Sequence, residues 1–237
     1  MSERVTIAVK DHIADVRFNR PDKMNALDAE QIDAIVEAGE KLAAMEGIRA
    51  IVLSGEGRAF CAGLDMGTFA ASAAAASETS KDGEKSPLAS TLTDRTFGNA
   101  NKYQHIVLLW RKLKAPVIAA IHGPCIGGGG DAENDADQCE LTYTNRIFTG
   151  EEGKELGFVT HLSENPHARA MEIAREIASK HPQAVQVAKD LINHLPDMNE
   201  DEILMMESVG QEKVSRTPNQ VEAVMAFMQK RAANFTD

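Results

Sequence analysis

Two short apolar runs, each ending in a glycine turn, constrain the fold of this 237-residue chain more than any other feature. The run RAIVLS at 49–54 is followed by GEGRAFCAGLDM, and the run PVIAAIH at 116–122 is followed by GPCIGGGGD. Nearly continuous apolar runs of this length, bounded by glycine, are typical of strands buried on both faces. Because helical patterns surround both runs, the sequence predicts an α/β fold.

The patterns before and between these strands predict a hairpin and two helices. Residues 5–18 alternate apolar and polar side chains on both sides of an expected turn at Lys10–Asp11, which indicates an antiparallel hairpin. Asp28 is placed to cap a helix that runs to Gly47. A second apolar helical stripe covers 103–113, whereas residues 70–101 predict a mobile loop or a short frayed helix.

The last third of the chain is predicted to be mostly helical. A short helix at 151–157, closed by a glycine, is expected to lead into a brief strand at Phe158-Val159. Pro182 and Pro218 lie at expected helix starts, where the missing N–H is harmless. Four further helices are predicted at 166–180, 182–195, 199–215 and 218–233.

The composition of the chain is that of a globular protein and excludes some classes of partner. Apolar residues make up 43% of the chain, which is enough for a sizeable core. The formal net charge of -11 argues against nucleic acid or an anionic membrane surface as a partner, because both would be repelled. No signal-peptide pattern opens the chain and no apolar run is long enough to span a membrane, so we expect a cytoplasmic protein.

The three cysteines give no spacing signal. Cys61, Cys125 and Cys139 are odd in number and lack the spacing of a metal or redox motif. We expect them to be small buried or unreactive thiols, with no disulfide and no metal site.

The two glycine turns suggest a chemical role. A glycine turn ahead of a helix leaves backbone N–H groups unpaired, and two such turns side by side could direct two donors at one oxygen. An oxyanion hole of this kind stabilises negative charge on a carbonyl oxygen, as when a thioester becomes an enolate. It needs no nucleophile, and the sequence has no nucleophile elbow to supply one.

Four motifs, in this order and spacing, resemble those of the crotonase (enoyl-CoA hydratase/isomerase) superfamily. They are RFNRPDKMNALD (17–28), SGEGRAFCAGLDM (54–66), PVIAAIHGPCIGGG (116–129) and LTYTNRIFTGEEGKELGFV (141–159). The resemblance implies a spiral core of β-β-α units in residues 1–160 and a C-terminal helical lobe in 161–237. It also implies homotrimers, often paired into hexamers, and Met-rich helical segments at 202–209 and 221–228 support association independently.

By the same resemblance, the chain binds an acyl-CoA thioester as substrate and needs no other cofactor. The two oxyanion donors are expected to be the N–H groups of Leu64 and Gly128. Basic Lys230, at the end of the last helix, belongs to the best basic cluster on an acidic chain. The residues expected to contact coenzyme A are Lys23, Met24, Ala26, Ala62, Gly63, Asp65, Gly127 and Lys230.

The sequence departs from the family pattern directly after the second glycine turn. Asp131 occupies the position of one family carboxylate and is the acid/base candidate, with Glu133 as a weaker one. The helix, strand and second acid that should follow are replaced by the acidic stretch DAENDADQ, which we expect to be a solvated loop. A calcium loop is excluded, because its sixth and twelfth positions hold Ala136 and Thr142.

A block of several tens of residues is therefore missing near 130–140. A genuine deletion, an incomplete sequence and a rebuilt loop would each explain the gap. Two functions follow from these alternatives. The leading one is an enzyme of the hydratase/isomerase type that stabilises a thioester enolate. The other is a catalytically impaired crotonase-fold protein that serves as an acyl-CoA-binding or oligomerisation module.

Overall fold

A four-stranded sheet forms the centre of the molecule. The computed structural model describes residues 4–67, 92–126 and 135–237. The strands are β1 (Val5–Lys10), β2 (Ile13–Phe18), β3 (Ala50–Gly55) and β4 (Val117–Ala119), in the order β1-β2-β3-β4. The helical elements are η1 (Pro21–Lys23), α1 (Ala29–Ala44), α4 (Lys102–Lys112), α5 (Asp135–Thr144), α6 (Gly150–Glu155), α7 (Pro166–Ala178), α8 (Pro182–His194), η2 (Leu195–Asp197), α9 (Glu200–Val214) and α10 (Pro218–Met228).

The pairing of the strands confirms the hairpin and the two buried strands. β1 and β2 pair antiparallel with Val5 opposite Phe18, and β2–β3 and β3–β4 pair parallel. The hairpin turn lies at Asp11–His12, one residue later than expected, and both residues have a positive φ. β4 is limited to three residues, shorter than the apolar run 116–122, because the backbone from residue 122 on pairs with the first glycine turn instead.

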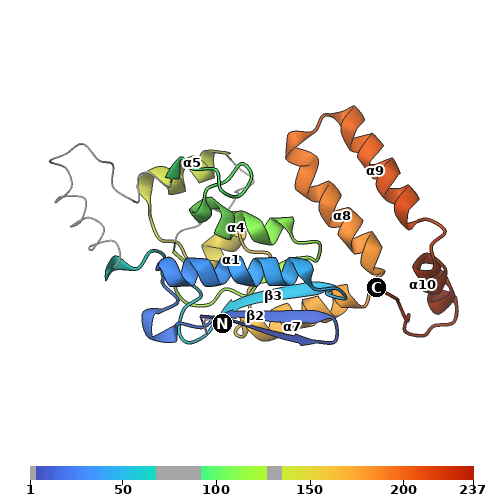
Figure 1. Cartoon of the computed structure of the whole chain (residues 1–237), viewed down its shortest axis with the longest axis horizontal. Coiled ribbons are helices and arrows are strands. Elements are labelled where there is room, and N and C mark those ends of the chain that lie inside the picture. Colours follow the sequence, from blue (N-terminus) through green and yellow to red (C-terminus); the bar gives the residue numbers. More distant parts are fainter. Residues whose placement is uncertain (1–3, 68–91, 127–134) are drawn as a thin grey trace.

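Helices cover both faces of the sheet (Figure 1). On one face, α1 and α4 pack their apolar side chains against Val16, Ile51 and Leu53. As expected, α1 begins at an Asp28 cap, whose side chain accepts the N–H of Gln31 at 2.8 Å. On the other face, an alanine stripe on α7 lets that helix lie close to the sheet. The stripe consists of Ala170, Ala174 and Ala178.

A charged network also joins α7 to the sheet. Asp15 on β2 accepts hydrogen bonds from His167 on α7, at 3.0 Å, and from Arg17, at 2.7 and 3.1 Å. Arg17 also bonds Glu56, at 2.7 Å, at the start of the first glycine turn. Burial alone would raise the pKa of Asp15, but the hydrogen bonds from Arg17 and His167 outweigh it and lower that pKa.

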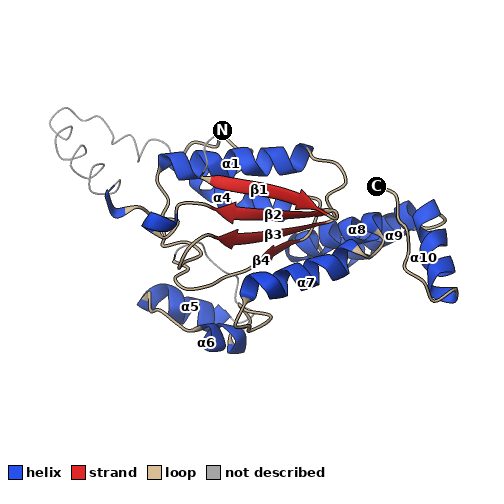
Figure 2. Ribbon diagram, turned by 90° about the horizontal axis from the view of Figure 1, so that it is seen from below, coloured by secondary structure: helices blue, strands red, loops and turns tan. Residues whose placement is uncertain are grey.

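The helices α8, α9 and α10 extend away from the sheet (Figures 1 and 2). Lys189 on α8 donates to the backbone carbonyls of Trp110, Leu113 and Ala115 at 3.2, 2.6 and 2.8 Å, which satisfies the C-terminal end of α4. The helical part expected from residue 161 on thus contains one helix on the sheet and three that extend from it.

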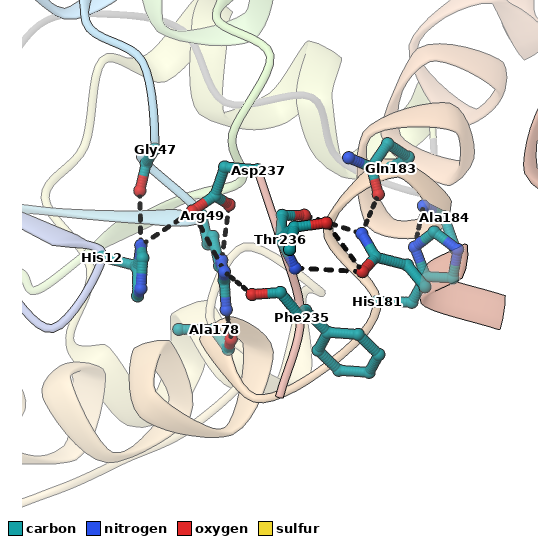
Figure 3. A network of polar contacts seen from close by, with 11 residues as sticks. His12, Gly47, Arg49, Ala178, His181, Gln183, Ala184, Phe235, Thr236 and Asp237 are labelled. Atoms are coloured by element: carbon teal, nitrogen blue, oxygen red, sulfur yellow. Dashed lines mark hydrogen bonds and ion pairs between the residues drawn. The ribbon is translucent and has the colours of Figure 1, made fainter. Parts of the chain in front are cut away.

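Residues 235–237 return to the core and fasten these helices to it (Figure 3). Arg49 binds the Asp237 carboxylate through two nitrogens, at 2.7 and 3.0 Å, and also donates to the carbonyl of Phe235. Asn219 on α10 accepts the N–H of Thr236 at 3.0 Å and donates to its carbonyl at 2.7 Å. The bidentate contact holds the tail at the N-terminal end of β3.

Three expectations after residue 130 need correction or qualification. The acidic stretch is not a loop throughout, since α5 begins at Asp135 and includes its last four residues. Phe158-Val159 is not a strand, because the Val159 N–H bonds the carbonyl of Gly153 in a turn that closes α6. The last helix ends at Met228, five residues before the expected end. The loop expected at 70–101 lies mostly outside the described residues.

Candidate active site

The first glycine turn, residues 55–63, is held against the segment 20–27 by Asn25. This side chain is completely buried, at 0% exposure, and its backbone has a φ of 56°. Its amide nitrogen donates to the carbonyls of Glu56 and Ala59 at 3.0 and 2.8 Å, and its oxygen accepts the N–H of Arg20 at 2.8 Å. The Asn25 amide therefore provides hydrogen-bond partners for backbone groups that have no backbone partner in this turn.

The end of the first turn pairs with the same segment. The Leu27 N–H donates to the carbonyl of Gly63 at 2.7 Å, and the Asp65 N–H donates to the carbonyl of Leu27 at 3.0 Å. Leu27 and Leu64 thus form a parallel bridge in which Leu27 bonds both neighbours of Leu64. In this pattern the Leu64 N–H points away from Leu27. No residue in the described part of the chain accepts it.

The second glycine turn lies alongside the first. The Phe60 N–H donates to the carbonyl of His122, the Cys61 N–H to that of Pro124, and the Ile126 N–H to that of Cys61. Gly123 permits this contact, because its φ is 57° and a Cβ there would lie 2.1 Å from the carbonyl oxygen of Arg58. Gly63 has a φ of 81°, and a Cβ there would lie 3.1 Å from the carbonyl oxygen of Ile126.

Of the two expected oxyanion donors, Leu64 lies within the described residues and Gly128 lies outside them. Leu64 lies at the end of the first turn with a free N–H among the described residues, and its side chain is 54% exposed. The second turn is described up to Ile126, next to Gly63. Gly127, Gly128 and Asp131 lie outside the described residues.

Most of the residues expected to contact coenzyme A lie together. The Ala62 N–H donates to the carbonyl of Met24 at 2.9 Å, so the segment 23–26 follows the first turn. Ala26 is buried between them, and Lys23 is exposed on η1. Lys230 is not brought to this group, since it follows α10 at the opposite end of the molecule (Figure 2).

The Asp65 carboxylate is engaged within the chain. It binds Arg20 Nη1 at 2.8 Å and accepts the N–H of Gly67 at 2.9 Å. Arg20 also binds Asp28 at 3.0 Å and the carbonyl of Ala26 at 3.0 Å. Arg20 and Asn25 are thus the two side chains that shape the site and that motif reasoning did not single out. The sequence feature that could have indicated them is that both are polar residues within RPDKMNAL, a segment that we interpreted only as a contact for coenzyme A.

Within the described ranges, no group of three or more His, Cys, Asp or Glu side chains could hold a metal ion. The helices described there are also too short or too polar to cross a membrane.

Comparison with known proteins identifies the family. The family model for enoyl-CoA hydratase/isomerase matches residues 8–137, which is more than half of the chain. The chain belongs to this enzyme family. Enoyl-CoA hydratase EchA19 of Mycobacterium tuberculosis is 28% identical, with 94% of this chain and 93% of the relative covered. The mouse mitochondrial Delta(3,5)-Delta(2,4)-dienoyl-CoA isomerase is 29% identical, with 97% and 80% covered.

Solved structures confirm the crotonase fold of the family. The crystal structure of enoyl-CoA hydratase from Bacillus anthracis has a TM-score of 0.82 at 22% identity, covering 98% of this chain and 99% of that one. The structure of a putative enoyl-CoA hydratase from Streptomyces coelicolor A3(2) has a TM-score of 0.82 at 21% identity, covering 100% of this chain and 95% of that one.

The alignments with these relatives also contain positions that this chain does not fill. The match to EchA19 runs over 263 positions, although 94% of 237 residues is only about 223, so about 40 positions are filled by the relative alone. In the alignment with the mouse isomerase, about 40 positions are again filled by the relative alone. The family model stops at residue 137, inside the acidic stretch. The relatives therefore have about 40 more aligned positions than this chain fills.

Proposed function

We propose that this chain binds an acyl-CoA thioester and stabilises its enolate in an oxyanion hole formed by the N–H groups of Leu64 and Gly128. The observation that carries the proposal is the Leu64 N–H, which the Leu27 bridge directs away from its own segment. Relatives named as an enoyl-CoA hydratase and a dienoyl-CoA isomerase support the substrate class, since both act on unsaturated acyl-CoA esters.

The two turns support the second donor. Gly63 and Ile126 lie close together, since a Cβ on Gly63 would lie 3.1 Å from the carbonyl oxygen of Ile126. Two backbone donors on one oxygen stabilise charge that develops there, without a covalent intermediate. Asp131, three residues after Gly128, is the proposed acid/base that moves a proton at the carbons next to the thioester.

Coenzyme A is proposed to bind along the first turn. Lys23, Met24, Ala26, Ala62 and Gly63 line one continuous stretch of backbone, and exposed Lys23 can meet a phosphate. Asp65 acts there through its bond to Arg20, which fixes the residue after Leu64. The proposed contact from Lys230 would have to come from another copy of the chain, because α10 lies at the far end of this one.

The alternative function is an acyl-CoA-binding or oligomerisation module with impaired catalysis. The observation that favours it is the loss of about 40 positions that the relatives have. The three-residue strand β4 is the edge of the described sheet, with β3 as its partner on one side only, and sheet edges are usually covered or protected. A missing helix and strand at this place would leave the acyl pocket incomplete.

Turnover and binding, measured on the same preparation, separate the two. Hydration of crotonyl-CoA and isomerisation of a 3-enoyl-CoA are followed by absorbance, and binding of a saturated acyl-CoA by calorimetry. Turnover supports the enzyme, and binding without turnover supports the module. Absence of any binding would contradict both proposals.

We further propose that the chain assembles as a homotrimer or a pair of trimers. Large apolar side chains are exposed on α9 and α10, among them Phe227 at 85%, and a monomer rarely exposes so many together. The others are Leu204, Met205, Val209, Val221, Val224, Met225 and Met228. Light scattering after size exclusion should give three or six times the chain mass, and a stable monomer at micromolar concentration would contradict assembly.

A further inference from the structure

Cys61 and Cys125 lie directly opposite each other where the two glycine turns run side by side. They are register partners in an isolated parallel bridge. The bridge is fixed by two hydrogen bonds, from Cys61 N–H to the carbonyl of Pro124 at 3.2 Å and from Ile126 N–H to the carbonyl of Cys61 at 2.9 Å. The 63 residues between them in sequence hid this relationship, and spacing alone predicted no disulfide.

The geometry of a bridge matches that of a disulfide. Paired strands lie about 4.7–4.9 Å apart, and residues opposite each other point their side chains to the same side. A disulfide requires Cα atoms roughly 4.4–6.8 Å apart with converging Cβ atoms. The register of the bridge therefore places the two cysteines where a disulfide can close.

The two thiols also differ in access. Cys61 is buried, as expected for a small buried thiol, whereas Cys125 is exposed. Partial desolvation by the surrounding chain raises the pKa of both thiols, also that of exposed Cys125, and the proximity of Cys61 raises the pKa of Cys125 further. A backbone hydrogen bond from Gly63 to the Cys61 thiol acts in the opposite direction. The Cys125 thiol can thus react with a reagent from solvent, and the Cys61 thiol lies next to it.

We propose that Cys61 and Cys125 form a reversible disulfide that fastens the two glycine turns to each other, by exchange with a low-molecular-weight disulfide. The Cys125 thiolate attacks one sulfur of the reagent, forms a mixed disulfide and releases the first thiolate, which takes up a proton. The Cys61 thiolate then attacks the Cys125 sulfur and releases the second thiol. Two protein thiols are oxidised, and one reagent disulfide is reduced to two thiols.

The bond would act directly on the candidate active site. Cys61 lies two residues before Gly63, and its thiol is a hydrogen-bond partner of the Gly63 backbone. A disulfide would replace that thiol by a covalent tie between the turns that carry Leu64 and the second glycine run. Closing the loop from 61 to 125 also restricts the unfolded chain, so the oxidised protein should melt at a higher temperature.

The test uses oxidised glutathione on the full chain at mildly alkaline pH, where more thiolate is present. Trypsin leaves Cys125 and Cys139 in one peptide, 115–146, and a second protease that cuts before aspartate separates them at Asp131. Peptides are then mapped by mass spectrometry without reduction. The expected product is a peptide pair joined through Cys61 and Cys125, two hydrogens lighter than the reduced pair and lost on reduction, with Cys139 free.

Single variants make the test independent of the wild-type yield. Cys125→Ser should lose the link and leave Cys61 unmodified, whereas Cys61→Ser should accumulate a glutathione adduct on Cys125. Cys139→Ser should behave as the wild type. A link that involves Cys139, or a wild-type protein in which Cys125 carries only glutathione and Cys61 stays free, would overturn the proposal.

Discussion

Leu27 bonds the residues on both sides of Leu64, so the backbone of the first turn and not a side chain sets the direction of the Leu64 N–H. The segment that supplies Leu27 is in turn held by Asn25 and Arg20. The candidate hole therefore depends on a few buried contacts well before the glycines in sequence. Changes at those contacts should affect activity without touching substrate.

Asn25→Ala should destabilise the protein and reduce activity. It leaves the buried carbonyl of Ala59 without its amide donor, which costs about 1–3 kcal/mol. Asn145→Ala is the matched control, because Asn145 also has a positive φ but is exposed, so it isolates the backbone effect. Urea unfolding of both variants measures the difference. Equal losses of unfolding free energy in the two variants would show that the Asn25 side-chain hydrogen bonds do not stabilise the protein.

Gly123→Ala should be far more damaging than Gly98→Ala. Both glycines have a positive φ, so both substitutions carry the left-handed strain of about 1–2 kcal/mol. Only at Gly123 does the new Cβ collide with a backbone oxygen, that of Arg58, while Gly98 has open space. Thermal unfolding should show a lower melting temperature for Gly123→Ala. Similar melting temperatures would mean that the two turns are not packed as described.

Asp15→Asn should weaken the protein in a pH-dependent way. The pKa of Asp15 is lowered in the folded state, so its contribution is fully present above the ordinary aspartate pKa of about 3.9 and is lost as pH falls through the lower folded value. At neutral pH the variant should lose about 1–3 kcal/mol of unfolding free energy.

The control for Asp15 is Glu172→Gln, which breaks an exposed pair with Arg169 and should change little. Urea unfolding from pH 7 down to pH 3 gives both curves. The gap between wild type and Asp15→Asn should narrow as pH falls below about 4. A gap that stays constant would rule out an ionised Asp15 as its source.

Periodicity and glycine placement were sufficient for most of the fold. The Asp28 cap, the helix that ends at Lys112 and the strand from Ala50 were all predictable, because each depends on local pattern. The predicted strand at Phe158-Val159 is wrong, since a short apolar pair folds as a strand only where a neighbouring strand exists to pair with it. β4 is shorter than the apolar run 116–122 predicts, because the end of that run pairs with the first glycine turn.

The candidate site was predictable only in part. Motif order located Leu64, Met24 and Ala62, and the structure brings these together. The buried role of Asn25 and the opposition of Cys61 and Cys125 were not predictable, because both depend on contacts between turns distant in sequence. Asp131 and Gly128 lie beyond the described residues and remain predictions from the motif.

Asp131→Asn should lower turnover by about 10²- to 10⁴-fold, the usual contribution of a general acid/base. Acyl-CoA affinity should stay nearly unchanged, because the carboxylate would act on the reacting carbons and not on the nucleotide. Glu133→Gln, two residues later, is the control. Steady-state kinetics and calorimetry on both variants decide which carboxylate acts. Full activity in Asp131→Asn would remove this residue from the mechanism.

The central claim is that the Leu64 N–H binds the thioester oxygen, and Leu64→Pro compared with Leu64→Ala tests it most directly. Proline removes the N–H, whereas alanine keeps it and shortens a side chain that is 54% exposed. Turnover of crotonyl-CoA and of a 3-enoyl-CoA is measured for both variants, with circular dichroism to verify folding. Leu64→Pro should lose about 10²- to 10³-fold in kcat while Leu64→Ala stays close to the wild type. A folded Leu64→Pro variant as active as Leu64→Ala would contradict the account.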